Sequence, residues 1–321
     1  MFAVLTTSWP LLLGVMLLMV GNGMQGSLLG IRGAIEGFST FELSLVMSAY
    51  FLGFLGGSRM TPDLIRRVGH VRVFAALASL ISASLVIYPV LPNWFAWTLL
   101  RVCIGFSFSG VYVTAESWLN NQSTNETRGQ TLSFYMIVQM LGIIMSQALL
   151  NVADPSDFTL FVIPSVLVSL AFIPILLTAS TAPVFESAKS MKFKELFIAS
   201  PLGCVGMFVT GGIFSALFGM ASVWGTEAGL SVRDISIFIA SIYVGGLLMQ
   251  YPIGRASDRM DRRIMVTALA LLGFLIAFVV FVFKVPFVGF LAVGFLLGGI
   301  TNPLYSLLIA HTNDFLETDQ M

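Results

Sequence analysis

Ten apolar stretches, each about as long as a membrane-spanning helix, dominate this chain. A helix needs about 20 apolar residues to cross a hydrocarbon core of ~30 Å, and it satisfies its own backbone hydrogen bonds there. The sequence therefore predicts an all-α polytopic membrane protein. The expected spans are residues 9–30, 40–58, 71–90, 94–118, 129–150, 158–178, 197–224, 234–254, 264–283 and 286–310.

Composition excludes the water-soluble alternatives. Hydrophobic residues make up 57% of the 321 residues and charged residues 10%, whereas a soluble domain has roughly 45–50% and 25%. The net charge is zero, so no attraction to nucleic acid is expected. The two cysteines, Cys103 and Cys204, are too few for a disulfide framework or a zinc site. We expect no cofactor, no metal and no ATP-driven step, since no phosphate-binding loop is present.

The basic residues indicate how the chain is oriented. Twelve of the 16 Lys and Arg residues fall in one alternate set of loops, and three fall in the other. The positive-inside rule then places both termini in the cytoplasm.

The two halves of the chain share a weak internal repeat at a separation of 193 residues. Ser48, Tyr50, Gly53, Leu55 and Arg66 match Ser241, Tyr243, Gly246, Leu248 and Arg259. A duplicated helical bundle is a plan of secondary transporters, although these residue types also recur by chance in membrane helices. We expect a six-helix N-terminal bundle at 1–178, a cytoplasmic central loop at 179–196, an incomplete four-helix C-terminal bundle at 197–310 and a cytoplasmic tail at 311–321. The 6 + 6 plan would need two more spans, which predicts a truncated product, a fragment or a degenerate relative of such a transporter.

The loop after the eighth span carries a recognisable motif. Gly254-Arg-Ala-Ser-Asp258-Arg259-Met-Asp-Arg262-Arg263 resembles the major facilitator superfamily pattern G-x-x-x-D-R-x-G-R-R, with Asp261 at the second Gly. The alternative is an ordinary basic inner loop. As a gate, Gly254 would allow a tight exit from the helix and Asp258 would lie at a helix N-terminus. The Arg residues would pair with carboxylates and helix C-termini.

The corresponding loop of the first half departs from this pattern, because Ile65 takes the Asp position. This variant, together with the stretches from Asn22 to Arg32 and from Tyr112 to Asn120, looks like the YcaD-type branch of the superfamily. The resemblance implies the superfamily fold and a monomer in the bacterial inner membrane. It also implies secondary transport of a small solute by alternating access, driven by the solute gradient or by an ion such as H⁺. A non-transporting remnant is the alternative, and no enzyme activity is expected. The cargo is not implied.

Arg101 in the fourth span is the only basic residue deep in a span. Arg101, Gly105 and Ser109 resemble the superfamily's R-x-x-x-G-x-x-x-small motif and share a helix face. An unpaired buried cation is costly, so Arg101 should face a cavity or a partner; it could also snorkel to the outer interface. The resemblance implies a role in proton coupling or in binding an anionic group.

Two sets of candidate site residues follow. Glu116, at the cytoplasmic end of the fourth span, would pair with inner-loop arginines, or would be a solvated helix-end carboxylate. The expected gate comprises Gly254, Asp258, Arg259, Arg262, Arg263, Arg66, Arg67 and Glu116. Polar side chains inside spans are candidates for contacting the solute or for joining helices. With Arg101, they are Asn22, Gln25, Tyr135, Gln139, Tyr243, Gln250, Asn302 and Tyr305. The two histidines, His70 and His311, are expected in loops.

Overall fold

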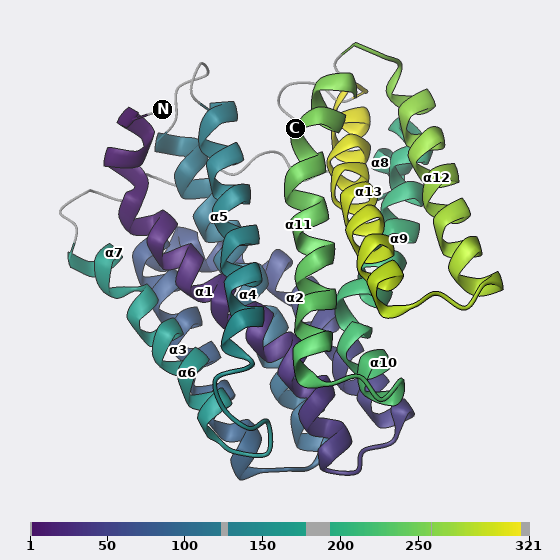
Figure 1. Cartoon of the computed structure of the whole chain (residues 1–321). Coiled ribbons are helices and arrows are strands. Elements are labelled where there is room, and N and C mark those ends of the chain that lie inside the picture. The colour runs from purple at the N-terminus through teal and green to yellow at the C-terminus, as the bar shows by residue number, and fades with distance from the viewer. Residues whose placement is uncertain (1, 123–127, 178–192, 258, 316–321) are drawn as a thin grey trace. The chain divides into compact units, whose positions relative to one another are not determined.

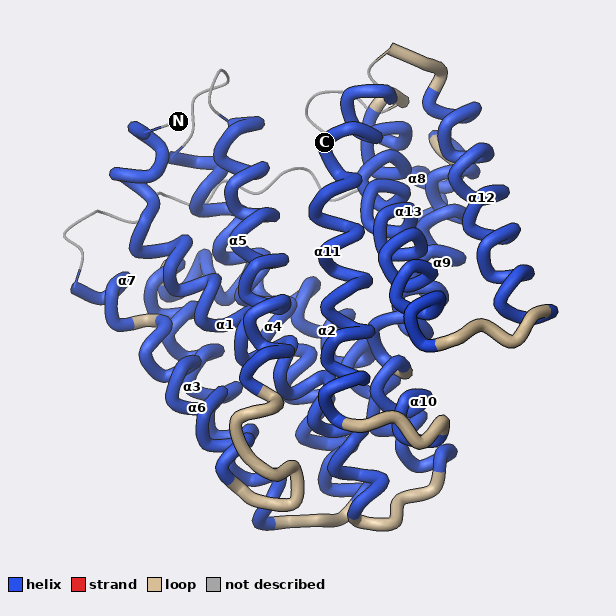
Figure 2. Tube along the Cα trace, viewed as in Figure 1, coloured by secondary structure: helices blue, strands red, loops and turns tan. Residues whose placement is uncertain are grey.

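The computed structural model describes residues 2–122, 128–177, 193–257 and 259–315. Within these ranges the chain is helical apart from short links, and no strand occurs (Figures 1 and 2). The helices are α1 (Phe2–Ile35), α2 (Thr40–Val68), α3 (His70–Val90), α4 (Trp94–Gln122), α5 (Arg128–Leu149), α6 (Thr159–Ala171), α7 (Ile173–Leu177), α8 (Phe193–Ala199), α9 (Pro201–Phe214), the π-helix η1 (Ser215–Gly219), α10 (Ala221–Glu227), α11 (Val232–Ser257), α12 (Arg262–Val282) and α13 (Phe287–Asn313).

Most of the expected spans correspond to continuous helices. Among the described residues, nine helices are long and apolar enough to cross a membrane, and a shorter apolar helix covers Ser133–Leu149. Their apolar side chains cover much of the outside: Phe208 is 85% exposed and Phe281 is 87% exposed. Such surface is stable only against lipid. The chain is a multi-pass membrane protein.

The predicted seventh span, 197–224, is wrong as one continuous helix. The chain breaks at Ser200, whose side chain accepts a hydrogen bond from the backbone N–H of Gly203, and Pro201 begins α9. Proline lacks the N–H that would continue the preceding helix. After Phe214 the chain forms η1 and then the separate short helix α10.

The chain divides into two compact units. The first comprises Met1–Phe185 and Gly219–Ser236, and the second comprises Glu186–Phe218 and Ile237–Met321. In the first unit α1 packs against α5, α6 and α10, while α4 packs against α2 and α3. In the second, α13 packs against α9 and α12. The division into six helices, a central loop and four helices stays a prediction.

Each unit contains a helix crossing at which glycines on both helices allow close approach. In the first, a Cβ on Gly53 would collide with the Val102 carbonyl oxygen, and one on Gly105 with the Tyr50 carbonyl oxygen. Small residues allow such close backbone approach.

The second unit repeats the crossing with Gly245 against Phe295 and Gly298 against Ile242. Gly105 and Gly298 are separated by 193 residues, but Gly53 and Gly245 are separated by 192. The duplication is therefore present in the packing. The sequence alignment is one residue out of register in α11.

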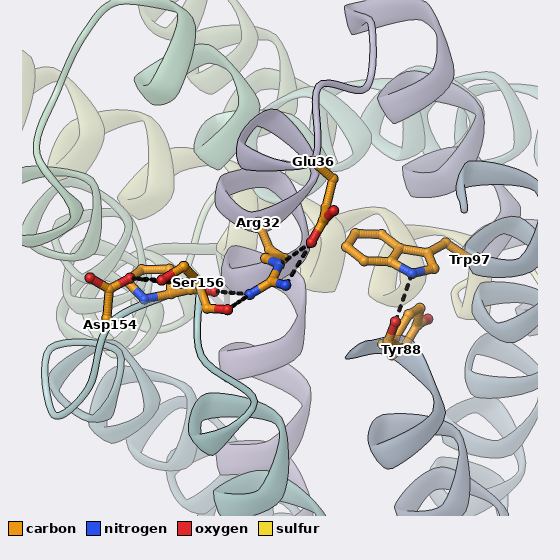
Figure 3. A network of polar contacts seen from close by, with 7 residues as sticks. Arg32, Glu36, Tyr88, Trp97, Asp154 and Ser156 are labelled. Atoms are coloured by element: carbon orange, nitrogen blue, oxygen red, sulfur yellow. Dashed lines mark hydrogen bonds and ion pairs between the residues drawn. The ribbon is translucent and has the colours of Figure 1, made fainter. Parts of the chain in front are cut away.

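Arg32 fixes the end of α1 to the loop before α6 (Figure 3). It pairs with Glu36 at 2.6 Å and donates hydrogen bonds to the carbonyl oxygens of Pro155, at 3.0 Å, and of Ser156. In the same loop, the hydroxyl and the N–H of Ser156 both donate to Asp154 and hold the pKa of that carboxyl below its usual value. These contacts hold the loop to one end of the first unit.

Candidate functional site: a polar cluster around Arg101

Arg101 lies inside the first unit with neutral partners. Its side chain is 5% exposed, and its Nη1 donates a hydrogen bond to Oε1 of Gln25 at 2.9 Å. Its Nη2 reaches only the Sδ of Met47, at 3.6 Å. The guanidinium carbon lies 4.8 Å from the centre of the Tyr50 ring, a cation–π geometry. The Nε atom is buried without a hydrogen-bond partner.

A chain of hydrogen bonds leads from this cation toward less buried side chains. Nε2 of Gln25 donates to Oδ1 of Asn22 at 3.3 Å, and Nδ2 of Asn22 donates to the Tyr112 hydroxyl at 3.4 Å. Asn22, Tyr50 and Tyr112 are half-buried, whereas Gln25 is 1% exposed. The cluster thus has a buried charged end and a more open polar end.

Helix geometry assembles these residues. Asn22 and Gln25 are three positions apart on α1 and so share a face. The crossing of α2 and α4 at Gly105 sets the Tyr50 backbone against α4, one turn of helix from Arg101. Asn22, Gln25 and Arg101 were predicted candidates, and the structure brings them together. Tyr50, Tyr112 and Met47 were not candidates; Tyr50 and Tyr112 appeared only within the repeat and the family-like stretch.

The α11–α12 loop holds the expected gate motif. Asp258 lies outside the described residues. Gly254 is not at a helix exit as predicted, because α11 continues to Ser257, and the space around Gly254 is open. Asp261, the departure from the family pattern, caps α12 by accepting a hydrogen bond from the N–H of Arg263 at 2.8 Å. An N-cap carboxylate satisfies an otherwise unpaired donor and suits the helix dipole.

The arginines after this cap meet the end of α13. Arg262 forms an ion pair with Asp314 and donates to the carbonyl oxygen of Ala310 at 3.4 Å. The Arg263 guanidinium lies 5.8 Å from the centre of the Phe315 ring, and Arg259 is exposed. The loop is thus tied to a helix C-terminus within its own unit.

The first-half gate candidates have different surroundings. Arg66 and Arg67 are exposed, and Arg66 pairs with Asp63 at 3.1 Å within α2. Glu116 lies beside Tyr135 of α5. Gln139 reaches the Sδ of Met136, one turn away, at 3.8 Å. Tyr135, a candidate for contacting the solute, therefore lies next to the gate candidate Glu116.

The candidates of the second unit lie in aromatic and helix-joining contacts. Tyr243 packs on Phe218 with ring centres 4.8 Å apart, and Tyr305 packs on Phe214 at 5.9 Å. Nε2 of Gln250 donates to Ser306 at 2.9 Å. Asn302 donates to the Gly298 carbonyl, one turn earlier, at 3.2 Å and packs against Gly246.

Both histidines were predicted in loops, and both predictions are wrong. His70 is the first residue of α3 and is 1% exposed, and His311 lies in α13 and is 5% exposed. Among the described residues, no three His, Cys, Asp or Glu side chains gather as a metal site would require.

The fold and this cluster define a class of protein: a polytopic helical membrane protein with a duplicated bundle and a buried polar site. Comparison with known families specifies the class further. The profile of the Major Facilitator Superfamily matches residues 11–315. The chain belongs to this superfamily.

Individual relatives are more distant. The chain is 25% identical over 254 residues to the uncharacterized MFS-type transporter YcaD of Escherichia fergusonii, an alignment covering 78% of this chain and 66% of the relative. It is 27% identical over 256 residues to YcaD of Salmonella arizonae, with the same coverage. The chain thus spans slightly less than two thirds of the length of these relatives.

Solved structures with the same fold are also transporters. The chain is similar to the nucleoside transporter NupG, with a TM-score of 0.78 and 12% identity over 98% of this chain and 84% of that one. It is similar to the E. coli fucose:proton symporter FucP, with a TM-score of 0.64 and 15% identity over 99% and 86%. At these identities the likeness establishes the fold alone.

Proposed function

We propose that this chain belongs to a secondary transporter that moves a small solute across the bacterial inner membrane by alternating access. Family membership supports this proposal, and so do the fold-level neighbours, which are a nucleoside transporter and a fucose:proton symporter. The observation that carries it is the polar cluster around Arg101. Buried polar and charged groups in membrane helices are expensive and mark solute or ion pathways.

In this proposal the residues take separate roles. Arg101, Gln25 and Asn22, with Tyr50 and Tyr112, bind the solute. Tyr243 and Tyr305 contribute an aromatic contact, whereas Gln250 and Asn302 join helices. Both termini lie in the cytoplasm, the protein is a monomer surrounded by lipid, and H⁺ is the candidate coupling ion.

The gate belongs to the predicted cytoplasmic face. The gate has two parts, each of which closes the cytoplasmic side of its half in one state of the cycle. The part in the second half comprises Asp258, Arg259, Arg262 and Arg263. The part in the first half comprises Arg66, Arg67 and Glu116. The ion pair of Arg262 with Asp314 ties this loop to the end of α13 in the state that the structure shows.

Flux in proteoliposomes tests the proposal. Purified protein is reconstituted and screened for uptake of radiolabelled sugars, nucleosides, amino acids and organic acids. We expect flux of at least one class, with a loss of tenfold or more in Arg101→Gln and Asp258→Asn. Arg233→Gln is the matched control, because Arg233 is exposed. Unchanged flux in both test variants would reject the assigned roles.

A further inference from the structure

The arrangement of donors on Arg101 indicates what the cluster binds. A guanidinium offers five N–H donors in a planar fork. Nη1 is engaged by the Gln25 carbonyl oxygen, and the flat face lies on Tyr50. The remaining edge, formed by Nε and Nη2, has no acceptor at Nε and only the thioether of Met47 at Nη2. A thioether sulfur is a weak acceptor.

Within the part of the chain that the structure describes, no negative charge balances this cation. Among the described residues, no carboxylate lies within ion-pairing distance of Arg101. Buried cations in membrane proteins are normally paired. The site holds the Arg101 guanidinium in place but offers no strong acceptor to its Nε–Nη2 edge.

We propose that the Nε–Nη2 edge of Arg101 binds the carboxylate or phosphate group of the transported solute, displacing the sulfur of Met47. The proposal rests on the proposed function and adds the substrate class: a small organic anion. Two parallel N–H···O bonds from one guanidinium edge match the spacing of two oxygens on either group. Met47 is suited to yield, because its unbranched side chain has three rotatable bonds.

The neighbouring side chains fit such a ligand. The hydroxyls of Tyr50 and Tyr112 and the amide of Asn22 can donate to further oxygens of the solute, the Tyr112 hydroxyl by leaving the sulfur of Met19, to which it donates at 3.2 Å. The ring of Phe54 lies 6.0 Å from those of both Tyr50 and Tyr112 and forms an apolar wall beside them. An anionic group at Arg101 with a compact, partly polar body beyond it satisfies all of these contacts.

Thermal unfolding of the detergent-solubilised protein tests the assignment with matched probes. The carboxylate arm compares lactate, succinate and benzoate with lactamide, succinamide and benzamide. The phosphate arm compares inorganic phosphate and glycerol 3-phosphate with glycerol. We expect at least one anion to raise Tm in a saturable manner while its uncharged partner does not, and the responding arm identifies the headgroup.

Variants separate binding at Arg101 from general salt effects. In Arg101→Gln the anion affinity falls at least tenfold, and Arg101→Lys restores it only in part, because an ammonium cannot offer the planar fork. Met47→Ala keeps or tightens affinity, since it removes the competitor for Nη2. Arg233→Gln, with the same change at an exposed site, behaves as wild type.

Three results overturn the anion assignment. They are equal stabilisation by uncharged partners, an anion response retained in Arg101→Gln, or no response to any anion of either arm. Uptake of the same labelled probes into proteoliposomes then distinguishes two failures. If uncharged solutes are carried independently of Arg101, transport stands and the anion assignment falls; if no solute of any class is carried, the proposed function falls with it.

Discussion

The Arg101 guanidinium relies on one side-chain oxygen for its strongest contact. Gln25 supplies that oxygen at 2.9 Å from a nearly inaccessible position on α1. A hydrogen bond to a charged group contributes about 1.5–3 kcal/mol, and a buried donor left without an acceptor costs a similar amount. The pair therefore ties α1 to α4 and also holds the cation in its binding orientation.

Removing this acceptor should destabilise the protein. We expect Gln25→Leu to lower the free energy of unfolding by about 2 kcal/mol, seen as a lower Tm in detergent. Gln139→Leu is the matched control on α5, because Gln139 is half-buried and its side chain meets only a thioether at 3.8 Å; it should change stability by less than about 0.5 kcal/mol. Equal shifts in the two variants would show that Gln25 does not support Arg101.

At this scale the sequence predicted only part of the site. Arg101, Asn22 and Gln25 were predictable, because charged and amide side chains inside apolar spans stand out. Tyr50 and Met47 were not, because both residue types are ordinary in membrane helices and their role depends on how α2 packs. Asp261 was taken as a deviation from a motif, yet it serves as an N-cap, which is a local backbone role.

At the scale of elements, α2 and α4 approach each other closely at Gly53, Gly57 and Gly105. The contact of Gly53 with the Val102 carbonyl and of Gly105 with the Tyr50 carbonyl leaves no room for a methyl group. Because Tyr50 and Arg101 flank this crossing, its spacing also sets the distance between ring and guanidinium. Packing and site geometry are therefore coupled.

A methyl group at the crossing should separate the two helices. We expect Gly53→Ala to cost about 1–3 kcal/mol through overpacking, and to weaken anion binding as Tyr50 moves from Arg101. Gly56→Ala, one turn along the same helix, is the control, because its Cβ would meet only the Phe106 side chain at 3.7 Å. Thermal unfolding should leave Gly56→Ala unchanged or slightly stabilised, since alanine favours helix. A Gly53→Ala variant with the Tm of the wild type would show that α2 and α4 do not approach each other this closely at Gly53.

The elements were predictable where one apolar run forms one helix. The seventh span is present as Pro201–Gly219, but its predicted bounds were wrong. Pro201 begins a new helix, and η1 requires i→i+5 hydrogen bonds. A run that is apolar on every side carries no periodicity that would reveal them. The predicted register of the repeat was wrong by one residue in α11. Ser, Tyr and Gly matches at 193 residues could not distinguish Gly245 from its neighbour Gly246, which only the contact with Phe295 identifies.

For the whole molecule, hydropathy was sufficient to predict a multi-pass helical protein, and the family match agrees. The orientation predicted from loop charge stays a prediction. The two compact units could not be derived from sequence. Residues 219–236 group with the first unit although they follow the central loop, and this grouping depends on α10 packing against α1. In the proposed transport cycle, the net charge of the site sets the cost of reorienting the empty carrier.

An uncompensated buried cation predicts exchange in place of one-way flux. With an anion bound, the site around Arg101 is neutral; empty, it carries one positive charge that must be enclosed in a low-dielectric interior as the carrier reorients. Reorientation of the loaded carrier should therefore be faster. We expect efflux of an anion that binds at Arg101 to rise at least tenfold in proteoliposomes when the same anion is present outside, a difference of about 1.4 kcal/mol in barrier.

In Arg101→Gln the empty site is neutral, so the external anion should no longer accelerate the efflux that remains. The control variant Arg233→Gln should exchange like the wild type. Efflux that is equally fast with and without external anion in the wild-type protein would show that the charge of Arg101 does not limit the return of the empty carrier.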